Sequence, residues 1–310
     1  MKTYPLVSIG VPVYNSQAFI IETLESIKFQ TYRNIQLIIV DDCSTDKSLE
    51  IVKNWLQVNS QIFKIVTLIR NDENMGISYS CKMMEKKAEG VFFSLLGADD
   101  LLKPNKIDIQ VQYLIKNPHV ALVYSNTLLI DNQGILMQND YFKVQCFSCI
   151  NDNIGPSGFV FDKLIVEDFI PVSSVLVRKN ILDSVGGFDE TLFVEDWDLW
   201  LRICKKYPIH YMSGYYSLYR IHQDSVMRKS STLVKVYLSC CKAILKHRNI
   251  NKEIDGIIAK HITTYSVGMY RFGVINKKLL WLNFMYNKTF KSAFYYSLGL
   301  FNIKVNQKQH

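Results

Sequence analysis

Three groups of acidic residues in the sequence have the types and spacing needed for chemistry at one site. They are Asp41 with Asp42, Asp99 with Asp100, and Glu195 with Asp196 and Asp198. Two adjacent carboxylates repel each other, and a divalent cation that takes oxygen ligands relieves this repulsion. The pair in LLGADDLLKP, Asp99–Asp100, therefore favours a metal site. In FVEDWDLWLR, the cluster of Glu195, Asp196 and Asp198 could supply a general base, held in the wall of a cleft by packing of Trp197 and Trp200.

Each acidic group also has a purely structural interpretation. Asp41–Asp42 precede Ser44 and Thr45, and such residues often cap a helix by accepting hydrogen bonds from its free N–H groups. Asp99–Asp100 could likewise cap the helix that Pro104 starts. Glu195, Asp196 and Asp198 would complement the dipole at the start of their helix. Taken alone, Asp41–Asp42 are better interpreted as a cap, whereas the pairing of Asp99–Asp100 after an apolar run favours a metal.

The elements that must position these residues alternate along the first 125 residues. The expected strands span 7–13, 35–40, 62–69, 91–96 and 120–125, and the expected helices span 18–29, 47–56, 76–89 and 103–115. This alternation, with near-continuous apolar strands, predicts an α/β fold whose mostly parallel sheet carries helices on both faces. Ligands of such sheets bind outside the carboxyl ends of the strands. Tyr14, Asn15 and the first two acidic pairs fall at those ends.

The pattern changes in the second half of the chain. Residues 131–170 are expected to be irregular, residues 172–177 a strand and residues 196–206 a helix. From Thr232 onward only helical spacing remains. We therefore divide the chain into an α/β domain over residues 1–229 and a helical region over residues 230–310.

Four segments resemble family 2 glycosyltransferases and occur in that family's order. The opening of the family is similar to VSIGVPVYNSQAFIIETLESIKFQTYRNIQLIIVDDCSTD, and its DXD region to LLGADDLLKP. Its acceptor-side segment with the "ED" motif is similar to SSVLVRKNILDSVGGFDETLFVEDWDLWLR, and its late histidine motif to YRIHQDSVM. The resemblance implies a GT-A fold, Rossmann-like with a mostly parallel central sheet. The helical spacing from Thr232 onward adds a C-terminal helical extension to this fold. Residues 1–229 would then form the nucleotide-sugar-binding and catalytic domain.

The resemblance also implies a role for individual residues on the donor side. Pro12, Tyr14 and Asp42 would hold the nucleotide base, and Asp41 would support their loop. Asp99 would lie near the ribose or the metal. Asp100 would be the main ligand of Mn²⁺ or Mg²⁺, with His222 approaching the metal or the diphosphate. The expected phosphate partners are Arg220 and Arg228.

On the acceptor side, the resemblance makes Asp196 the catalytic base and gives the lining of the acceptor pocket to Gly187, Glu195 and Trp197. A divalent cation stabilises the diphosphate leaving group as a Lewis acid. A carboxylate within hydrogen-bond reach removes the proton of the acceptor hydroxyl. Inversion of the anomeric centre is implied by the family alone.

Two positions depart from the family's pattern. Many relatives begin the DXD region with Asp-Ala-Asp-Asp, but here the first position is Gly97. Many relatives also carry Ala-Arg-Asn where this chain has Ser80-Cys81-Lys82. These departures support an alternative hypothesis, in which the chain is a non-catalytic module that binds a nucleotide sugar or a glycan.

Composition and charge exclude several classes. Hydrophobic residues make up 48% and charged residues 21% of the 310 residues, which excludes a disordered or collagen-like chain. The seven cysteines include one CxxC, Cys146 to Cys149, without a second pair, so a zinc ribbon is not expected and a reducing cytosol is favoured. The N-terminal segment lacks the apolar core of a signal peptide. No apolar run reaches the length of a spanning helix, so we expect a cytoplasmic protein, at most attached to the inner face of the cytoplasmic membrane.

The net charge of +8 is unevenly distributed. Residues 230–310 hold 13 Lys and Arg but 2 Asp and Glu, whereas the first 229 residues hold 23 and 26. The aromatic-rich stretch 281–303 has three interpretations: packing on its own core, a homo-oligomer interface, or contact with an anionic membrane surface beside its lysines. No nucleic-acid partner is expected, because no recognition motif accompanies the basic charge.

The leading hypothesis is therefore a metal-dependent, inverting glycosyltransferase. Its donor would be a UDP-sugar and its acceptor a growing glycan, lipid-linked as the resemblance implies, in the synthesis of a bacterial O-antigen or capsule. The sequence contains no signal that identifies the sugar.

Overall fold

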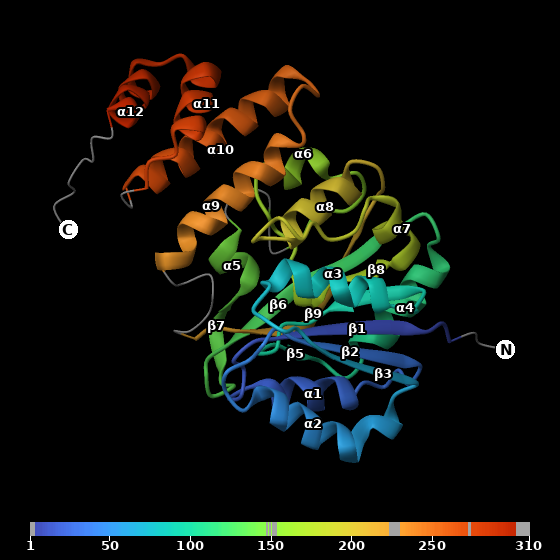
Figure 1. Ribbon diagram of the computed structural model, residues 1–310. Coiled ribbons are helices and arrows are strands. Elements are labelled where there is room, and N and C mark those ends of the chain that lie inside the picture. Colours follow the sequence, from blue (N-terminus) through green and yellow to red (C-terminus); the bar gives the residue numbers. More distant parts are fainter. Residues whose placement is uncertain are drawn as a thin grey trace. The chain divides into compact units, whose positions relative to one another are not determined.

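The computed structural model describes residues 4–146, 148, 150, 154–222, 230–271 and 274–301 (Figure 1). Within these ranges the chain forms two compact units. The first takes its residues from 1–191 and 195–222, and the second from 192–194 and 223–310. Each unit is described by itself.

The first unit is built around one mixed sheet of nine strands within the described residues, in the order β3-β2-β1-β4-β8-β6-β9-β5, with β7 paired to β6. The strands are β1 Val7–Val13, β2 Ile35–Asp41, β3 Ile65–Arg70, β4 Phe92–Leu95, β5 Leu101–Leu102, β6 Leu122–Ile130, β7 Leu136–Asp140, β8 Leu176–Arg178 and β9 His210–Arg220. The pairings make β1, β2, β3, β4, β6 and β9 run in one direction, and β5, β7 and β8 in the other. The predicted fold class, a mostly parallel α/β sheet, is confirmed.

Helices cover both faces of this sheet, with α1 and α2 on one face and α3 on the other (Figure 1). The helices of the first unit are α1 Ile20–Lys28, α2 Ser48–Asn59, α3 Ile77–Lys87, α4 Lys106–Lys116, α5 Tyr141–Gln145, α6 Phe161–Leu164, α7 Lys179–Ser184 and α8 Asp196–Cys204. Both faces need cover because every residue of β2 is buried, and in β1 all but the half-buried Pro12 are. Apolar side chains on alternate faces of a strand exclude water only when helices pack on both sides.

The structure corrects the prediction in two stretches. Residues 131–170, expected to be irregular, contain β7, α5 and α6. Four of the five residues of β7 are exposed, so this strand has no buried apolar pattern that would predict it from the sequence. Residues 172–174 form a 3₁₀ turn, and the expected strand is shortened to β8. The sequence reading also missed the long strand β9, whose mixed tyrosines and polar residues are mostly half-buried.

The second unit is helical in its described part, as expected. Its helices are α9 Ser230–Leu245, α10 Lys252–Arg271, α11 Lys277–Asn287 and α12 Phe290–Leu300. A small core joins Cys241, Met269 and Leu279, with Tyr237 and Tyr265 packed against it. Among the helices that the structure describes, none combines the length and the hydropathy needed to cross a membrane.

Candidate active site at the carboxyl ends of the strands

The loop after β1 is built around Asn15. Its backbone is left-handed, with φ of 49°, and its Oδ1 accepts hydrogen bonds from the Thr45 N–H at 2.8 Å and the Asp46 N–H at 3.3 Å. These bonds tie the loop after β1 to the loop after β2. The side chain of Tyr14 beside it is 47% exposed, so its ring is free to meet a flat ligand at this edge.

The two carboxylates after β2 serve different loops. Asp42 is buried, and its oxygens accept from the Asn71 side chain at 2.7 Å and from the Met75 and Gly76 N–H groups, both at 2.8 Å. Asp42 thus shapes the loop that leads into α3. Asp41 accepts from the Ser44 N–H at 3.1 Å through Oδ2, while its buried Oδ1 has no protein partner among the described residues. Asp41 therefore bonds within the loop before α2 and does not cap that helix, whose N-cap residue Lys47 makes no side-chain cap.

The second acidic pair separates into a buried and an accessible carboxylate. Asp100 is 2% exposed, and its two oxygens accept from the Ser173 hydroxyl and, at 3.0 Å, from the Arg220 N–H. Burial first, and then the charge of Asp99, raise the pKa of Asp100 well above its usual range. The side chain of Asp99 is 34% exposed, and its Oδ2 lies 3.0 Å from Nε2 of His222. The geometry therefore favours Asp99 over Asp100 as the residue that reaches a ligand.

Arg220, at the end of β9, holds this loop from beneath. Its fully buried guanidinium donates to the Asp99 carbonyl at 2.9 Å, to the Asp131 carbonyl at 3.1 Å and to the Glu22 carboxylate at 2.6 Å. It also stacks on the Phe19 ring at 4.7 Å. A guanidinium buried in this way is a structural clamp, so its position gives no support to the expected contact with phosphate. Arg228, the other expected phosphate partner, lies outside the described residues.

Gly97, the departure from the family's DXD pattern, has a visible consequence. A Cβ at this position would lie 2.9 Å from Oδ1 of Asp99 and 3.3 Å from Oδ2 of Asp100. The glycine leaves room for both carboxylates to fold back against the loop. The first position of the motif therefore supplies space here where many relatives supply a third carboxylate.

The third acidic group lies at the start of α8. Oδ1 of Asp196 accepts from the Trp197 N–H at 2.8 Å, and burial raises the pKa of Asp196. Glu195 is 7% exposed, and burial together with the charge of Asp196 raises the pKa of Glu195 to about 8. Asp168 belongs to the same group, because burial and then Asp196 raise the pKa of Asp168 well above its usual range. The charged forms of Asp168, Glu195 and Asp196 are thus all disfavoured in this part of the unit.

The raised pKa of Glu195 makes the free energy of unfolding depend on pH. Glu195 holds its proton up to about pH 8 when folded, against 4.5 for the model carboxyl. Its stabilising contribution is therefore complete below about pH 4.5 and is lost as the pH rises to about 8. We expect Glu195→Gln to remove a slope of up to about 1.4 kcal/mol per pH unit in that window. Urea unfolding at pH 5, 6.5 and 8 measures this slope.

The control for this experiment is Glu190→Gln, because Glu190 is exposed. We expect it to keep the slope of the unaltered chain. Equal slopes in the Glu195→Gln variant and the unaltered chain would contradict the assignment.

Gly187 and Trp197, expected to line the acceptor pocket, have structural contacts instead. Gly187 has φ of 67°, and a Cβ there would lie 1.9 Å from Oε1 of Glu85. Only glycine leaves room for that carboxylate, which accepts from the Phe188 N–H at 2.7 Å. Trp197 is 4% exposed, and its indole N–H donates to the Leu164 carbonyl at 2.9 Å. Both residues are buried in this structure.

Two helices contact members of the acidic groups. The N-terminal end of α3 is held by Asp42, and one turn further on the Cys81 thiol lies 4.0 Å from Oε1 of Glu195. On the other face of the sheet, the Thr23 hydroxyl of α1 donates to the Asp100 carbonyl at 2.9 Å. Helix α3 therefore links Asp42 to Glu195, while α1 supports the loop of Asp100.

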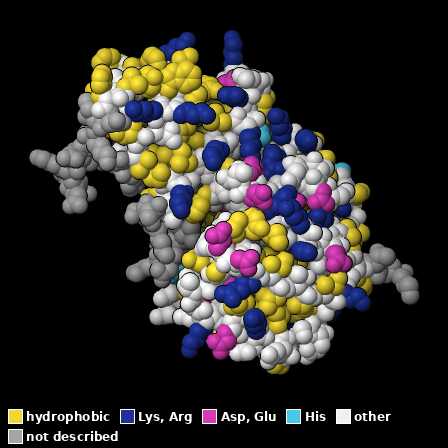
Figure 2. Space-filling view, viewed as in Figure 1, with side chains coloured by type: hydrophobic (Ala, Val, Ile, Leu, Met, Phe, Trp, Pro, Cys, Tyr) yellow, Lys and Arg dark blue, Asp and Glu magenta, His cyan; other side chains and the backbone are white. Residues whose placement is uncertain are grey.

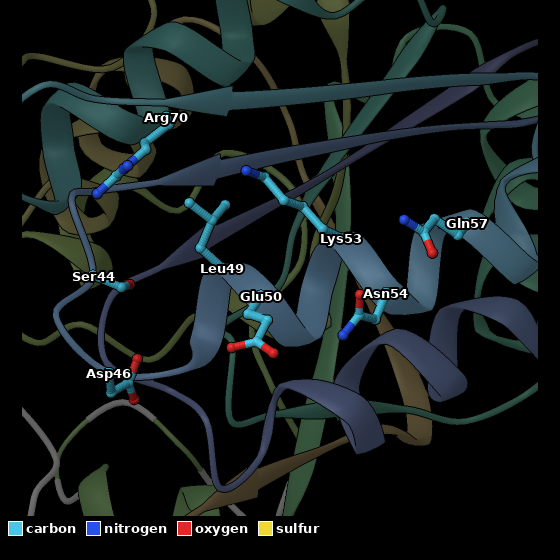
Figure 3. A pocket seen from close by; sticks show the side chains of 8 residues that line it. All are labelled: Ser44, Asp46, Leu49, Glu50, Lys53, Asn54, Gln57 and Arg70. Atoms are coloured by element: carbon cyan, nitrogen blue, oxygen red, sulfur yellow. The ribbon is translucent and has the colours of Figure 1, made fainter.

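A pocket of about 380 Å³ opens beside these loops. Figure 3 shows that its side chains come from α2, from the loop before α2 and from the end of β3: Ser44, Asp46, Leu49, Glu50, Lys53, Asn54, Gln57 and Arg70. Nε of Arg70 lies 3.9 Å from Oδ2 of Asp41. The pocket therefore borders the loop of Asp41 but does not include Tyr14, Asp99 or Asp196.

The types of residue present decide how a metal could be held. Within the described ranges, no three His, Cys, Asp or Glu side chains form a metal-binding group. Asp99 and His222 nevertheless offer a carboxylate and an imidazole side by side, and both are ligands of Mn²⁺. Hard divalent cations are often held by one or two protein groups together with phosphate oxygens of the substrate. The pair fits a cation that is shared with a bound diphosphate.

The mixed sheet with its carboxylates at one edge is the architecture of the GT-A glycosyltransferases, as solved structures of that fold confirm. S. aureus TarS 1–349 in complex with UDP-GlcNAc matches with a TM-score of 0.65 and 16% identity, covering 96% of this chain and 89% of that one. The mannosyltransferase PcManGT from Pyrobaculum calidifontis, in complex with GDP-Man and Mn²⁺, matches with a TM-score of 0.63 and 15% identity. It covers 98% of this chain and 86% of that one.

The chain belongs to glycosyl transferase family 2, whose family model matches residues 8–161. An uncharacterised glycosyltransferase of Rickettsia felis is 30% identical over 232 residues. These residues are 73% of this chain and 36% of the relative, so the chain spans about a third of that protein's length. The resemblance predicted from the four motifs is confirmed at the level of the family.

Proposed function

We propose that this chain transfers a sugar from a nucleotide-sugar donor, a UDP-sugar, to an acceptor hydroxyl with inversion at the anomeric centre. The observation that carries the proposal is the Asp99–His222 pair, in which a partly exposed carboxylate lies 3.0 Å from an imidazole nitrogen in the loops that follow the strands of the sheet. The acceptor would be a growing glycan, lipid-linked, in bacterial surface polysaccharide synthesis. This last part rests on the family resemblance.

On the donor side, the exposed ring of Tyr14 would pack against the base beside Pro12, which lies at the end of β1. An ionised carboxylate has about four acceptor positions. Asp42 uses three of them for the chain itself, so one remains for an N–H of the base. Asp41 would keep the loop after β2 in place through Ser44.

On the metal side, Asp99 and His222 would hold Mn²⁺ or Mg²⁺ against the diphosphate. The cation would supply Lewis-acid stabilisation of the leaving diphosphate. Asp100, bonded to Ser173 and to the Arg220 N–H, would fix the loop that presents Asp99. This assignment moves the main protein ligand from Asp100 to Asp99.

On the acceptor side, the Asp196 carboxylate would accept the proton of the attacking hydroxyl. A pKa of about 8 keeps Glu195 protonated at neutral pH. The neutral Glu195 leaves the negative charge of the pair on Asp196. Neighbouring carboxyl groups with different protonation states are typical of sites that carry out acid–base chemistry. We assign the acceptor side of the site to Asp196 and to Asp168, which lies in none of the sequence motifs.

Ligand-dependent thermal stability tests this proposal. We expect UDP with Mn²⁺ to raise the melting temperature by roughly 5 °C at a ligand concentration near 100 times the dissociation constant. Chelation of Mn²⁺ with EDTA is expected to remove most of that shift, and so is Asp99→Asn. GDP with Mn²⁺ serves as the matched ligand control for the choice of base.

Two results would count against the proposal. A shift with UDP that is unchanged by EDTA would exclude a cation shared with the diphosphate. A full shift without any release of UDP from a UDP-sugar, with or without acceptor, would favour the alternative of a non-catalytic binding module.

A further inference from the structure

The last two described helices carry large apolar side chains on their outer surface. On α11, Trp281 and Met285 are each 44% exposed and lie one helical turn apart. On α12, Phe290 and Phe294 are 90% and 49% exposed with the same spacing, and Phe301 just beyond the helix is 75% exposed. Figure 2 shows hydrophobic side chains gathered over these two helices. We call this set of five residues the α11–α12 surface.

The inner contacts of the two helices hold this surface in place. The rings of Phe284 and Tyr296 stack at 5.8 Å between centroids, and a Cβ at Gly299 would lie 2.6 Å from a methyl carbon of Leu280. A capping box of Thr289 and Ser292 fixes the start of α12. Because the inner faces are already packed, the exposed side chains have no room to turn inward.

The charge around the α11–α12 surface has one sign. Residues 274–301 contain four lysines and no Asp or Glu. The lysines are Lys277, Lys278, Lys288 and Lys291, all exposed, and no ion pair holds any of them within the described residues. Lys277 and Lys288 continue the exposed row of Trp281 and Met285 at either end of α11. An apolar patch bordered by cations fits a partner that is apolar inside and anionic at its surface.

We infer that the α11–α12 surface docks on an anionic phospholipid bilayer. Aromatic side chains would enter the boundary between headgroups and acyl chains, while the lysines would contact the anionic headgroups. A second copy of this chain fits less well. A two-fold contact places the same patch on both sides of the interface, so lysines would meet lysines without a nearby carboxylate.

Flotation with lipid vesicles tests the inference on the full chain. We expect binding to vesicles of phosphatidylcholine with 30 mol% phosphatidylglycerol. Binding to vesicles of phosphatidylcholine alone is expected to be weaker by roughly tenfold or more. Phe290→Ser with Phe294→Ser is expected to weaken binding to the anionic vesicles by roughly tenfold or more. Lys288→Gln with Lys291→Gln is expected to have a similar effect and to reduce the dependence on salt.

The matched control is Phe29→Ser with Val58→Ser, since these side chains of the first unit are 60% and 68% exposed. We expect this control to bind vesicles as the unaltered chain does. All variants should keep the thermal shift given by UDP with Mn²⁺, so a failure here is distinct from a failure of the proposed function. No binding to anionic vesicles at low salt would overturn the inference. Equal binding by the control and by the Phe290→Ser, Phe294→Ser variant would also overturn it. So would a dimer, detected by sedimentation for the unaltered chain and the control, that the Phe290→Ser, Phe294→Ser variant does not form.

Discussion

Asp196→Asn is expected to lower kcat by roughly 10²–10⁴-fold while donor binding stays unchanged. The acceptor hydroxyl must lose its proton as it attacks, and an amide cannot accept that proton. The substitution is otherwise conservative, because the amide oxygen of asparagine can still accept the bond from the Trp197 N–H at 2.8 Å. The measurement is the rate of UDP release with a glycan acceptor, beside the thermal shift with UDP and Mn²⁺.

The neighbouring carboxyl group provides the matched control for this substitution. Glu195→Gln keeps a neutral side chain where a pKa of about 8 already keeps Glu195 protonated at neutral pH. We therefore expect a loss of activity much smaller than that of Asp196→Asn. Unchanged transfer by the Asp196→Asn variant would exclude Asp196 as the base, and a larger loss from Glu195→Gln would move the role to Glu195.

Arg220→Ala is expected to lower the free energy of unfolding by about 3 kcal/mol and to abolish the stabilisation by UDP with Mn²⁺. The guanidinium is fully buried and donates to the carbonyls of Asp99 and Asp131 as well as to Glu22. Removal would leave the Asp99 carbonyl and the Glu22 carboxylate without the Arg220 donors and open a void beneath the loop of Asp99, although the Asp131 carbonyl would keep the bond from the Gly134 N–H at 3.1 Å. Urea unfolding measures the first effect, and ligand-dependent melting measures the second.

Two other substitutions separate the clamp from a general effect of losing an arginine. Arg220→Lys keeps the charge but cannot reproduce a fork of several N–H groups, so we expect an intermediate loss. Arg33→Ala removes an exposed side chain that makes one bond, to the Lys28 carbonyl at 3.1 Å, and should change stability by less than about 0.5 kcal/mol. A similar loss of stability in the Arg33→Ala and Arg220→Ala variants would contradict the structural role of Arg220 beneath the Asp99 loop.

The part of the fold that the sequence predicted is the part with the strongest burial pattern. The strands β1, β2 and β4 lie inside the sheet between other strands, and nearly all their residues are buried. Such strands appear in the sequence as apolar runs, which is why their positions were predicted within a residue or two. The acidic pairs then followed, because polar residues directly after buried strands must lie at the ligand edge of the sheet.

The rest depends on contacts between segments that are far apart in the sequence. Asp99 and Asp100 are adjacent and identical in type, yet Ser173 and the Arg220 N–H engage only Asp100. No local pattern distinguishes the two residues. Asp168 lies in a stretch of short elements without periodicity and joins the site only through its proximity to Asp196. The motif predicts a role for Gly187 in the acceptor pocket. In the structure, a side chain at this position would collide with the carboxylate of Glu85, which comes from α3 and could not be predicted from the motif.

The position of β9 in the sheet has a consequence for the order in which the chain is made. This strand lies between β6 and β5, and β5 pairs with no other strand in the described chain. Its last residue, Arg220, supplies the donors beneath Asp99 and Asp100. Synthesis runs from the N-terminus, and domains fold as their residues emerge. A nascent chain that has already folded its first four strands therefore still lacks the Arg220 donors that hold the loop of Asp99 and Asp100.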